Sequence, residues 1–327
     1  MPIGSNTAAT VNLRPDLASF FEFDVELEKQ GFVGNKVLPI VNVSLQADNP
    51  GKIPVEQLLQ VGNTARASGS GYGRGQWSFE RFTYATEEHG WEEPVDDRDK
   101  QRYSNLFDAE AIATLRAQSI IARNYETRVA SAIFNTSTWT GSGLTTAVTN
   151  EWDDFTSAVP LTDVESAVQK VYDGSGLKAN ALVVNWKVFR NLRNCDQVIE
   201  RIQSQGAGDR TLATDVTAQM LATAFDLDYV IVAGASRNSA TQGQAASIGQ
   251  IWSGEYAMVC RISDSLDMRD PCIGRTFHWT GDGSALDGVI ETYRDEVVRS
   301  DIVRCRFETD EVVMYAQAGH LLSNITT

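Results

Sequence analysis

The chain has 327 residues, and 42% of them are hydrophobic, so it can bury the core of one large domain or of two modest ones. It carries 28 basic and 43 acidic residues. The resulting net charge of -15 argues against a surface that grips the phosphates of nucleic acid. No apolar run approaches the ~20 residues that span a bilayer, so we predict no membrane segment.

Catalytic and metal-binding patterns are missing from the sequence. The four cysteines form no CxxC pair and are predicted to be buried, reduced thiols: Cys195, Cys260, Cys272 and Cys305. None of the three histidines belongs to an HExxH motif, and there is no GxSxG elbow. The glycines of residues 69–75 fit neither GxGxxG nor GK[ST], so they predict a flexible loop rather than a nucleotide site. We therefore expect no enzyme activity, no cofactor and no metal.

The first 40 residues are predicted to form an arm. Asp16 can cap a short helix over residues 17–28, whose Phe20, Phe21 and Phe23 need a covering surface. Gly31 and Gly34 then end it.

Residues 41 to about 90 predict a long hairpin. One strand is expected at 41–45 and an aromatic return strand at 76–84, joined by a Pro/Gly-rich tract and a glycine-studded loop at 68–75. The aromatic parity changes between Phe79 and Phe82, which predicts a bulge or a change of the covered face near 80–81. An isolated two-stranded ribbon is marginal in water, so the hairpin needs a partner surface. Another copy of the same chain is the most economical partner.

The candidate subunit-interface residues are the aromatic and charged side chains of this hairpin. They are Arg66, Arg74, Trp77, Phe79, Arg81, Phe82, Tyr84, Glu87, Glu88 and Trp91. The acidic stretch at 87–97 has two interpretations. It is either a solvated face or an acidic patch that meets Arg66, Arg74 or Arg81 of a neighbouring copy.

One long helix is predicted over residues 105–135, with Asn105 or Asp108 as its cap. Its apolar stripe recurs at spacings of three and four: Ile112, Leu115, Ser119, Ala122, Glu126, Val129 and Ile133. Glu126 interrupts the stripe. We expect it to be partly exposed and paired with Arg123 or Arg116, or else buried at a subunit contact.

Short strands and helices alternate from residue 157 to 285, which predicts a compact α/β domain. Buried strands are expected at 181–184 and 229–233, further strands at 248–252 and 256–262, and helices at 163–172, 186–192 and 214–225. The last 40 residues return to strands at 289–298, 302–307 and 312–316, with a turn at Thr309–Asp310.

The order of these parts resembles the major capsid proteins of tailed bacteriophages, the HK97-fold family. Similar local passages are residues 32–39 (FVGNKVLP), 107–111 (FDAEA), 180–185 (NALVVN) and 312–322 (VVMYAQAGHLL). The resemblance covers nearly the whole chain and implies an α+β, HK97-like capsid fold. Its parts would be an N-terminal arm (1–40), an extended E-loop (41–98), a peripheral P-domain (99–156 and 286–327) with the spine helix at 105–135, and an axial A-domain (157–285).

The resemblance also implies a function. The chain would assemble with itself as hexamers and pentamers into an icosahedral shell that encloses double-stranded DNA without sequence-specific binding. A scaffolding protein, a portal protein and a decoration protein would be its partners. It would be assembled in the host cytoplasm and reside in the virion. Many members of the family begin with a long scaffolding segment, and no stretch before residue 40 resembles one. We therefore expect either that such a segment was removed or that a separate scaffolding protein acts.

Three alternatives remain. An encapsulin-like bacterial compartment would share the same fold. A hydrolase or nucleotide enzyme on residues 157–285 would need a Gly-rich turn or an acid/base pair that the sequence lacks. A tail or decoration protein is disfavoured by the long helix.

Overall fold

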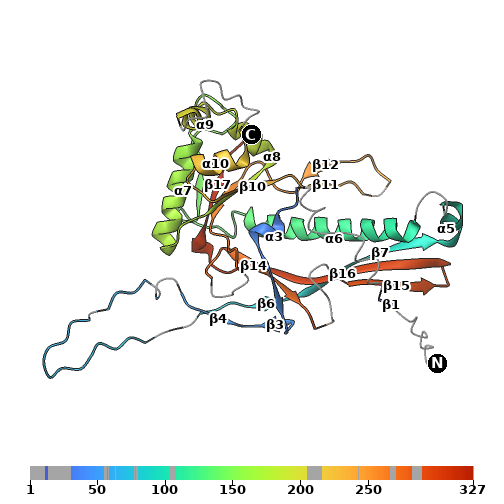
Figure 1. The fold of residues 1–327 in the computed structure, drawn as a ribbon, viewed down its shortest axis with the longest axis horizontal. Coiled ribbons are helices and arrows are strands. Elements are labelled where there is room, and N and C mark those ends of the chain that lie inside the picture. Colours follow the sequence, from blue (N-terminus) through green and yellow to red (C-terminus); the bar gives the residue numbers. More distant parts are fainter. Residues whose placement is uncertain are drawn as a thin grey trace.

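The computed structural model describes residues 12–13, 31–54, 57, 59–62, 64–76, 78, 80–103, 108–204, 216–241, 243–265, 270–281 and 289–326. The predicted helix at 17–28 and the predicted interface residues Trp77 and Phe79 lie outside the described residues. Two sheets organise the described chain, and a long loop projects from them (Figure 1).

The six-stranded sheet is built around β16 (Ser300–Val313). On one side β16 pairs with β15 (Val289–Asp295) and then with β14 (Gly274–Trp279), and on its other side with β7 (Glu87–Asp96). β2 (Ile40–Val43) joins β14 in parallel, and β1 (Asn12–Leu13) joins β15. The turn that we predicted at Thr309–Asp310 is wrong. Pairing of β14 with residues 309–313 keeps the strand continuous there.

The return strand that we predicted at 76–84 is also wrong. Only two short strands lie near its end, β5 (Glu80–Arg81) and β6 (Tyr84–Ala85), which pair with β4 (Gly51–Lys52) and β3 (Ala47–Asp48). The long strand is β7, within the acidic stretch. Its carboxylates are compatible with a strand because β7 lies at a sheet edge, where charged side chains reach water and protect the open edge.

The predicted long helix is confirmed as α6 (Ala109–Ile133), and Asp108 caps it by accepting from the backbone N–H of Glu110. α6 lies across one face of the six-stranded sheet and shares a core with Val303, Cys305 and Phe307. The predicted stripe holds in the second half, where Ala122, Glu126, Val129 and Ile133 are buried.

The stripe is wrong in the first half of α6. Ile112 and Leu115 are 40% and 39% exposed, and Ala113 and Ala117 are buried instead. The small alanine side chains let the helix approach the sheet closely, which a pattern based on large apolar residues misses. The short helix α5 (Asp97–Tyr103) connects β7 to the residues that precede α6.

The five-stranded sheet has the order β10 (Tyr229–Ala233), β9 (Ala181–Asn185), β13 (Ala257–Cys260), β17 (Gly319–Ser323) and β8 (Thr145–Ala147). Four helices share a second core with it: α7 (Pro160–Ser175), α8 (Trp186–Leu192), α9 (Asp196–Ile202) and α10 (Ala218–Ala224). The strands predicted at 181–184 and 229–233 and the helices at 163–172 and 186–192 are confirmed with small shifts of their ends. The helix predicted at 214–225 is confirmed from Ala218 to Ala224, and residues 214–215 lie outside the described residues.

Shorter elements complete the described fold. They are α3 (Gly34–Val37), the hairpin of β11 (Ser236–Asn238) and β12 (Ile248–Gln250), and the 3-10 helix η2 (Ala316–Ala318). Sheet membership crosses the predicted domain limits, since β14 belongs to the six-stranded sheet and β17 and β8 to the five-stranded sheet. These limits stay a prediction. The mixture of helices and strands agrees with the predicted α+β class.

Candidate subunit interface

The projecting loop packs against the rest of the subunit at its two ends, near Lys52 and near residues 82–84, which we call its root. Tyr84 stacks on Phe277 of β14, with ring centroids 4.6 Å apart, and Phe82 stacks on the same ring at 5.8 Å. The Lys52 Nζ donates to the backbone carbonyl of Met314 at 2.9 Å. Tyr84 is only 4% exposed. Our assignment of Tyr84 to the interface is therefore wrong, because Phe277 of the same subunit already packs against its ring. Phe82 packs on the same ring and is half-buried.

The distal part of the loop has few contacts with its own subunit. Between residues 59 and 76, the described side chains are exposed, including Arg66, Arg74 and Tyr72, the last of which is 74% exposed. Arg66 lies over the Tyr72 ring at 4.5 Å and donates from Nε to the Ser70 carbonyl at 2.6 Å. These contacts join residues within the tip of the loop, while the side chains of the tip remain exposed. Arg81, nearer the root, is also exposed.

The acidic strand β7 is largely matched by arginines of its own subunit. Glu92 accepts from Arg304 Nε at 2.7 Å, which raises the pKa of that guanidinium. The other ion pairs along this stretch are Glu93 with Arg116 at 3.7 Å, Glu88 with Arg306 at 3.9 Å and Asp97 with Arg294 at 2.6 Å. Neither sequence interpretation foresaw this pairing. Glu87 and Glu88 remain exposed. Trp91 is 45% exposed and donates its indole N–H to Glu93 at 3.0 Å.

Glu126 is buried inside the subunit, so the prediction of a partly exposed residue is wrong, and the alternative is right about burial but not about its partners, which belong to the same subunit. Its carboxylate accepts from the backbone N–H of Val33 at 2.9 Å, from that of Gly34 at 2.8 Å and from the Trp252 indole at 2.6 Å. Arg123, one predicted partner, donates to Ser119 and Ser236 instead. The only sequence signal for this role was a carboxylate within an apolar stripe.

His278, His320 and the four cysteines are buried in the fold. His320 bonds Thr146 Oγ1 at 2.9 Å and the Gly143 carbonyl at 3.0 Å, and His278 bonds Asn42 Oδ1 at 3.1 Å. All four cysteines are buried and free of disulfides, as predicted. Within the described ranges, no group of three His, Cys, Asp or Glu side chains is arranged to hold a metal ion. No helix of the described chain is long and apolar enough to cross a bilayer.

Comparison with known proteins agrees with this fold. No family model matches the chain. Among solved structures, a phage-related protein from Bordetella bronchiseptica superposes with a TM-score of 0.71 at 20% identity, covering 96% of this chain and 97% of that one. The capsid of cyanophage P-SCSP1u gives a TM-score of 0.57 at 10% identity, with 88% and 86% covered. The chain therefore has the HK97-like fold of phage capsid proteins.

Two curated relatives are both named major capsid protein. One, from Pseudomonas phage JBD67, is 25% identical over 294 residues, which cover 89% of this chain and 91% of the relative. The other, from Burkholderia phage BcepMu, is 24% identical over 302 residues, which cover 90% and 91%. The chain is accordingly recognised as a phage major capsid protein, as the order of its parts predicted.

Proposed function

We propose that this chain is a shell subunit that assembles as hexamers and pentamers into an icosahedral capsid around double-stranded DNA. The observation that carries the proposal is the projecting loop. Its root is packed against Phe277, while the side chains described between residues 59 and 76 are exposed. A long loop without a core of its own is expected to gain its stability from another surface. In a repeating shell that surface is a neighbouring copy.

The proposed contact between copies involves the members of the predicted set that are exposed, together with Trp77 and Phe79, which lie outside the described residues. We retain Arg66, Arg74, Trp77, Phe79, Arg81, Glu87, Glu88 and Trp91. Aromatic and arginine side chains are favoured at interfaces because they bury much area and form several hydrogen bonds. Since most acids of β7 already pair with arginines of their own subunit, we expect the loop arginines to bind backbone carbonyls or exposed carboxylates elsewhere on the next copy.

The remaining partners follow from this role. A scaffolding protein, a portal protein and a decoration protein would act on the shell during assembly and maturation. The net charge of -15 suits a wall that encloses DNA without adhering to it. We propose that the subunit has no catalytic activity, is assembled in the host cytoplasm and resides in the virion.

An encapsulin-like compartment is the second candidate. The SrpI encapsulin of Synechococcus elongatus has the same fold, with a TM-score of 0.52 at 10% identity. The curated relatives favour the capsid, since both are phage proteins.

Electron microscopy of the full chain, expressed alone and together with its neighbouring genes, tests the proposal. We expect closed shells, and nuclease-protected DNA in particles from the native source. Closed shells filled with a cargo enzyme instead of DNA would favour the encapsulin. A chain that stays monomeric under all conditions, including crowding, would contradict both.

A further inference from the structure

Glu126 connects three parts of the subunit through one carboxylate. From α6 it reaches the backbone N–H groups of Val33 and Gly34, at the start of α3, and the indole of Trp252. Trp252 is in turn held to the five-stranded sheet, because its carbonyl accepts from Asn185 Nδ2 at 3.1 Å. Glu126 is 1% exposed. This carboxylate thus joins three parts of the subunit. They are the spine helix α6, the segment at residues 31–37 that precedes β2, and the five-stranded sheet.

The segment held by Glu126 has a pivot at one end. Gly31 has φ +75°, and its carbonyl accepts from the Gly234 N–H at 2.9 Å. A Cβ on Gly31 would lie 2.8 Å from the Gly234 Cα, so glycine is required for this approach. The positive φ of Gly31 also favours glycine at this position.

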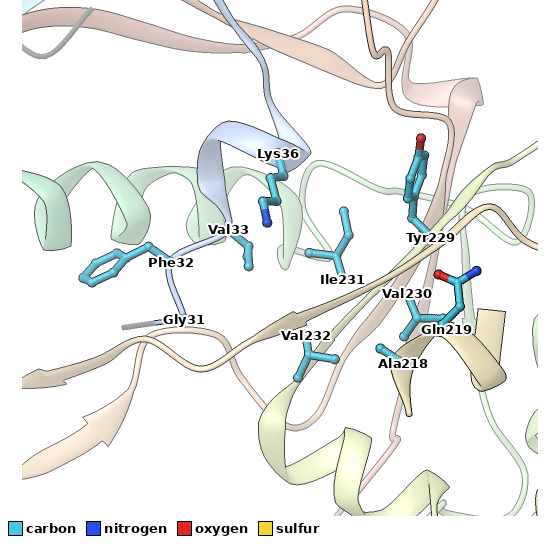
Figure 2. Close-up of a pocket in the computed structure, with 10 residues that line it drawn as sticks. All are labelled: Gly31, Phe32, Val33, Lys36, Ala218, Gln219, Tyr229, Val230, Ile231 and Val232. Carbon is cyan, nitrogen blue, oxygen red and sulfur yellow. The ribbon is translucent and has the colours of Figure 1, made fainter. Parts of the chain in front are cut away.

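The segment also has free space on one side. A hollow of about 360 Å³ lies between residues 31–36 and the edge strand β10. Val33 and Lys36 line it from the segment, and Tyr229 and Ile231 line it from β10 (Figure 2). The hollow leaves room for a small shift of Val33 and Lys36, while Val37 and Leu38 stay packed in the core.

We propose that Glu126 is a protonation-operated latch between the two sheets. As a carboxylate it accepts all three N–H groups and holds residues 31–37 and Trp252 against α6. As the neutral acid it carries an O–H donor and the negative charge is lost, so the protonated oxygen is a weaker acceptor and at least one of the three hydrogen bonds is weakened. The weakened segment then moves about the Gly31–Gly234 contact toward the hollow. The latch is a property of the subunit and does not depend on shell assembly.

Among the charged and titratable groups around Glu126, the proton of Glu126 itself is the one whose gain or loss changes these three hydrogen bonds. Arg123 on α6 is directed to Ser119 and Ser236, and Tyr125 donates toward the Leu38 carbonyl. Lys36 lines the hollow, and Glu255, beyond Trp252, is exposed.

Burial raises the pKa of Glu126, although its three hydrogen bonds act in the opposite direction. A raised folded-state pKa means that the folded chain takes up this proton more readily than the unfolded chain. This group therefore stabilises the fold increasingly as pH falls through its folded pKa. The three hydrogen bonds themselves lower the pKa of Glu126, so breaking them while the side chain stays buried raises it further. Protonation therefore favours the open latch, and it does so in a subunit that is still folded.

Hydrogen exchange of the full chain tests the latch. After correction for intrinsic exchange rates, we expect amides in peptides covering residues 31–38 to lose about tenfold protection between about pH 7.5 and a pH below the folded-state pKa of Glu126, which a titration of this carboxyl locates. Peptides covering β9 should not change. Glu126→Gln, which offers one acceptor oxygen and places N–H donors against the segment, should show the low protection at both pH values. Glu165→Gln, at an exposed glutamate of α7, is the matched control and should behave like the wild type.

Equal protection of residues 31–38 at both pH values in the wild type would overturn the latch. That measurement needs no variant, so it decides the question even if Glu126→Gln does not fold. Trp252→Phe removes one donor and keeps the carboxylate, so the pH dependence of residues 31–38 should persist in it. A loss of that dependence in Trp252→Phe would also contradict the proposal.

Discussion

Tyr84 and Phe277 form a stacked pair, with an interplanar angle of 14° and centroids 4.6 Å apart, although the two residues are far apart in the sequence. Phe277 is fully buried in β14, so the pair ties the return leg of the projecting loop to the six-stranded sheet. The loop is thereby divided into a root that belongs to the core and a distal part that does not. Mutations in the two parts should have different consequences.

Phe277→Ala should destabilise the subunit by about 3–5 kcal/mol, because it removes a buried aromatic side chain and leaves a cavity beside Tyr84 and Phe82. Denaturant unfolding followed by circular dichroism measures the free energy of unfolding. Tyr72→Ala, at an exposed ring of the distal loop, is the control and should change stability by no more than about 0.5 kcal/mol. Equal effects of the two substitutions would show that the root is not part of the core.

Deletion of residues 68–75 should leave the subunit folded and impair assembly. The described part of this segment is exposed, and both main cores are formed without it. Circular dichroism and subunit solubility should therefore change little. Anchors at an interface can each contribute ~2 kcal/mol or more, and in a shell the loss is repeated at every copy. Particle yield and heat resistance by electron microscopy measure the effect, and normal shells would mean that the loop is only decoration.

Ala122→Pro should give misfolded, insoluble protein. Ala122 is buried in the interior of α6, where proline removes a backbone donor and clashes with the preceding turn, at ~3 kcal/mol or more. Ala122→Gly keeps the donor and should cost about 1 kcal/mol, so it should remain soluble. The soluble fraction after expression distinguishes the two variants. A soluble, shell-forming proline variant would contradict the position of α6.

The four thiols should be inert in the native subunit. Burial raises the pKa of Cys195, Cys260 and Cys305 to about 12 and also raises that of Cys272. Almost no thiolate is then present near neutral pH, and the thiolate is the reactive form. A chromogenic disulfide reagent should detect no fast-reacting thiol before denaturation and all four after it. Ser70→Cys, on the exposed loop, should react at once. Rapid native labelling of the wild type would contradict the buried positions.

Local sequence patterns predicted the elements whose signal lies within one segment. The strands β9 and β10, helix α8 and the length of α6 agree closely with the predictions, because each is a short apolar run or a capped, proline-free periodic stretch. The order of these elements was enough to predict the fold class.

The elements that depend on a distant partner were predicted poorly. β7 is rich in glutamate, which disfavours strands, yet it pairs along ten residues of β16 and places Glu92 against Arg304. The candidate interface changed for the same reason. Tyr84 appeared to be available until β14 brought Phe277 against it.

The sequence by itself determined the long helix, the α/β segment and the resemblance to capsid proteins, since these depend on spacing, caps and order along the chain. Only the tertiary structure decided which face of α6 is buried in its first half, which partners hold Glu126 and which loop residues remain exposed. Each of these depends on the distance between residues far apart in sequence. Helical periodicity indicates that a face is apolar, but the shape of the packed neighbour decides which residues it covers.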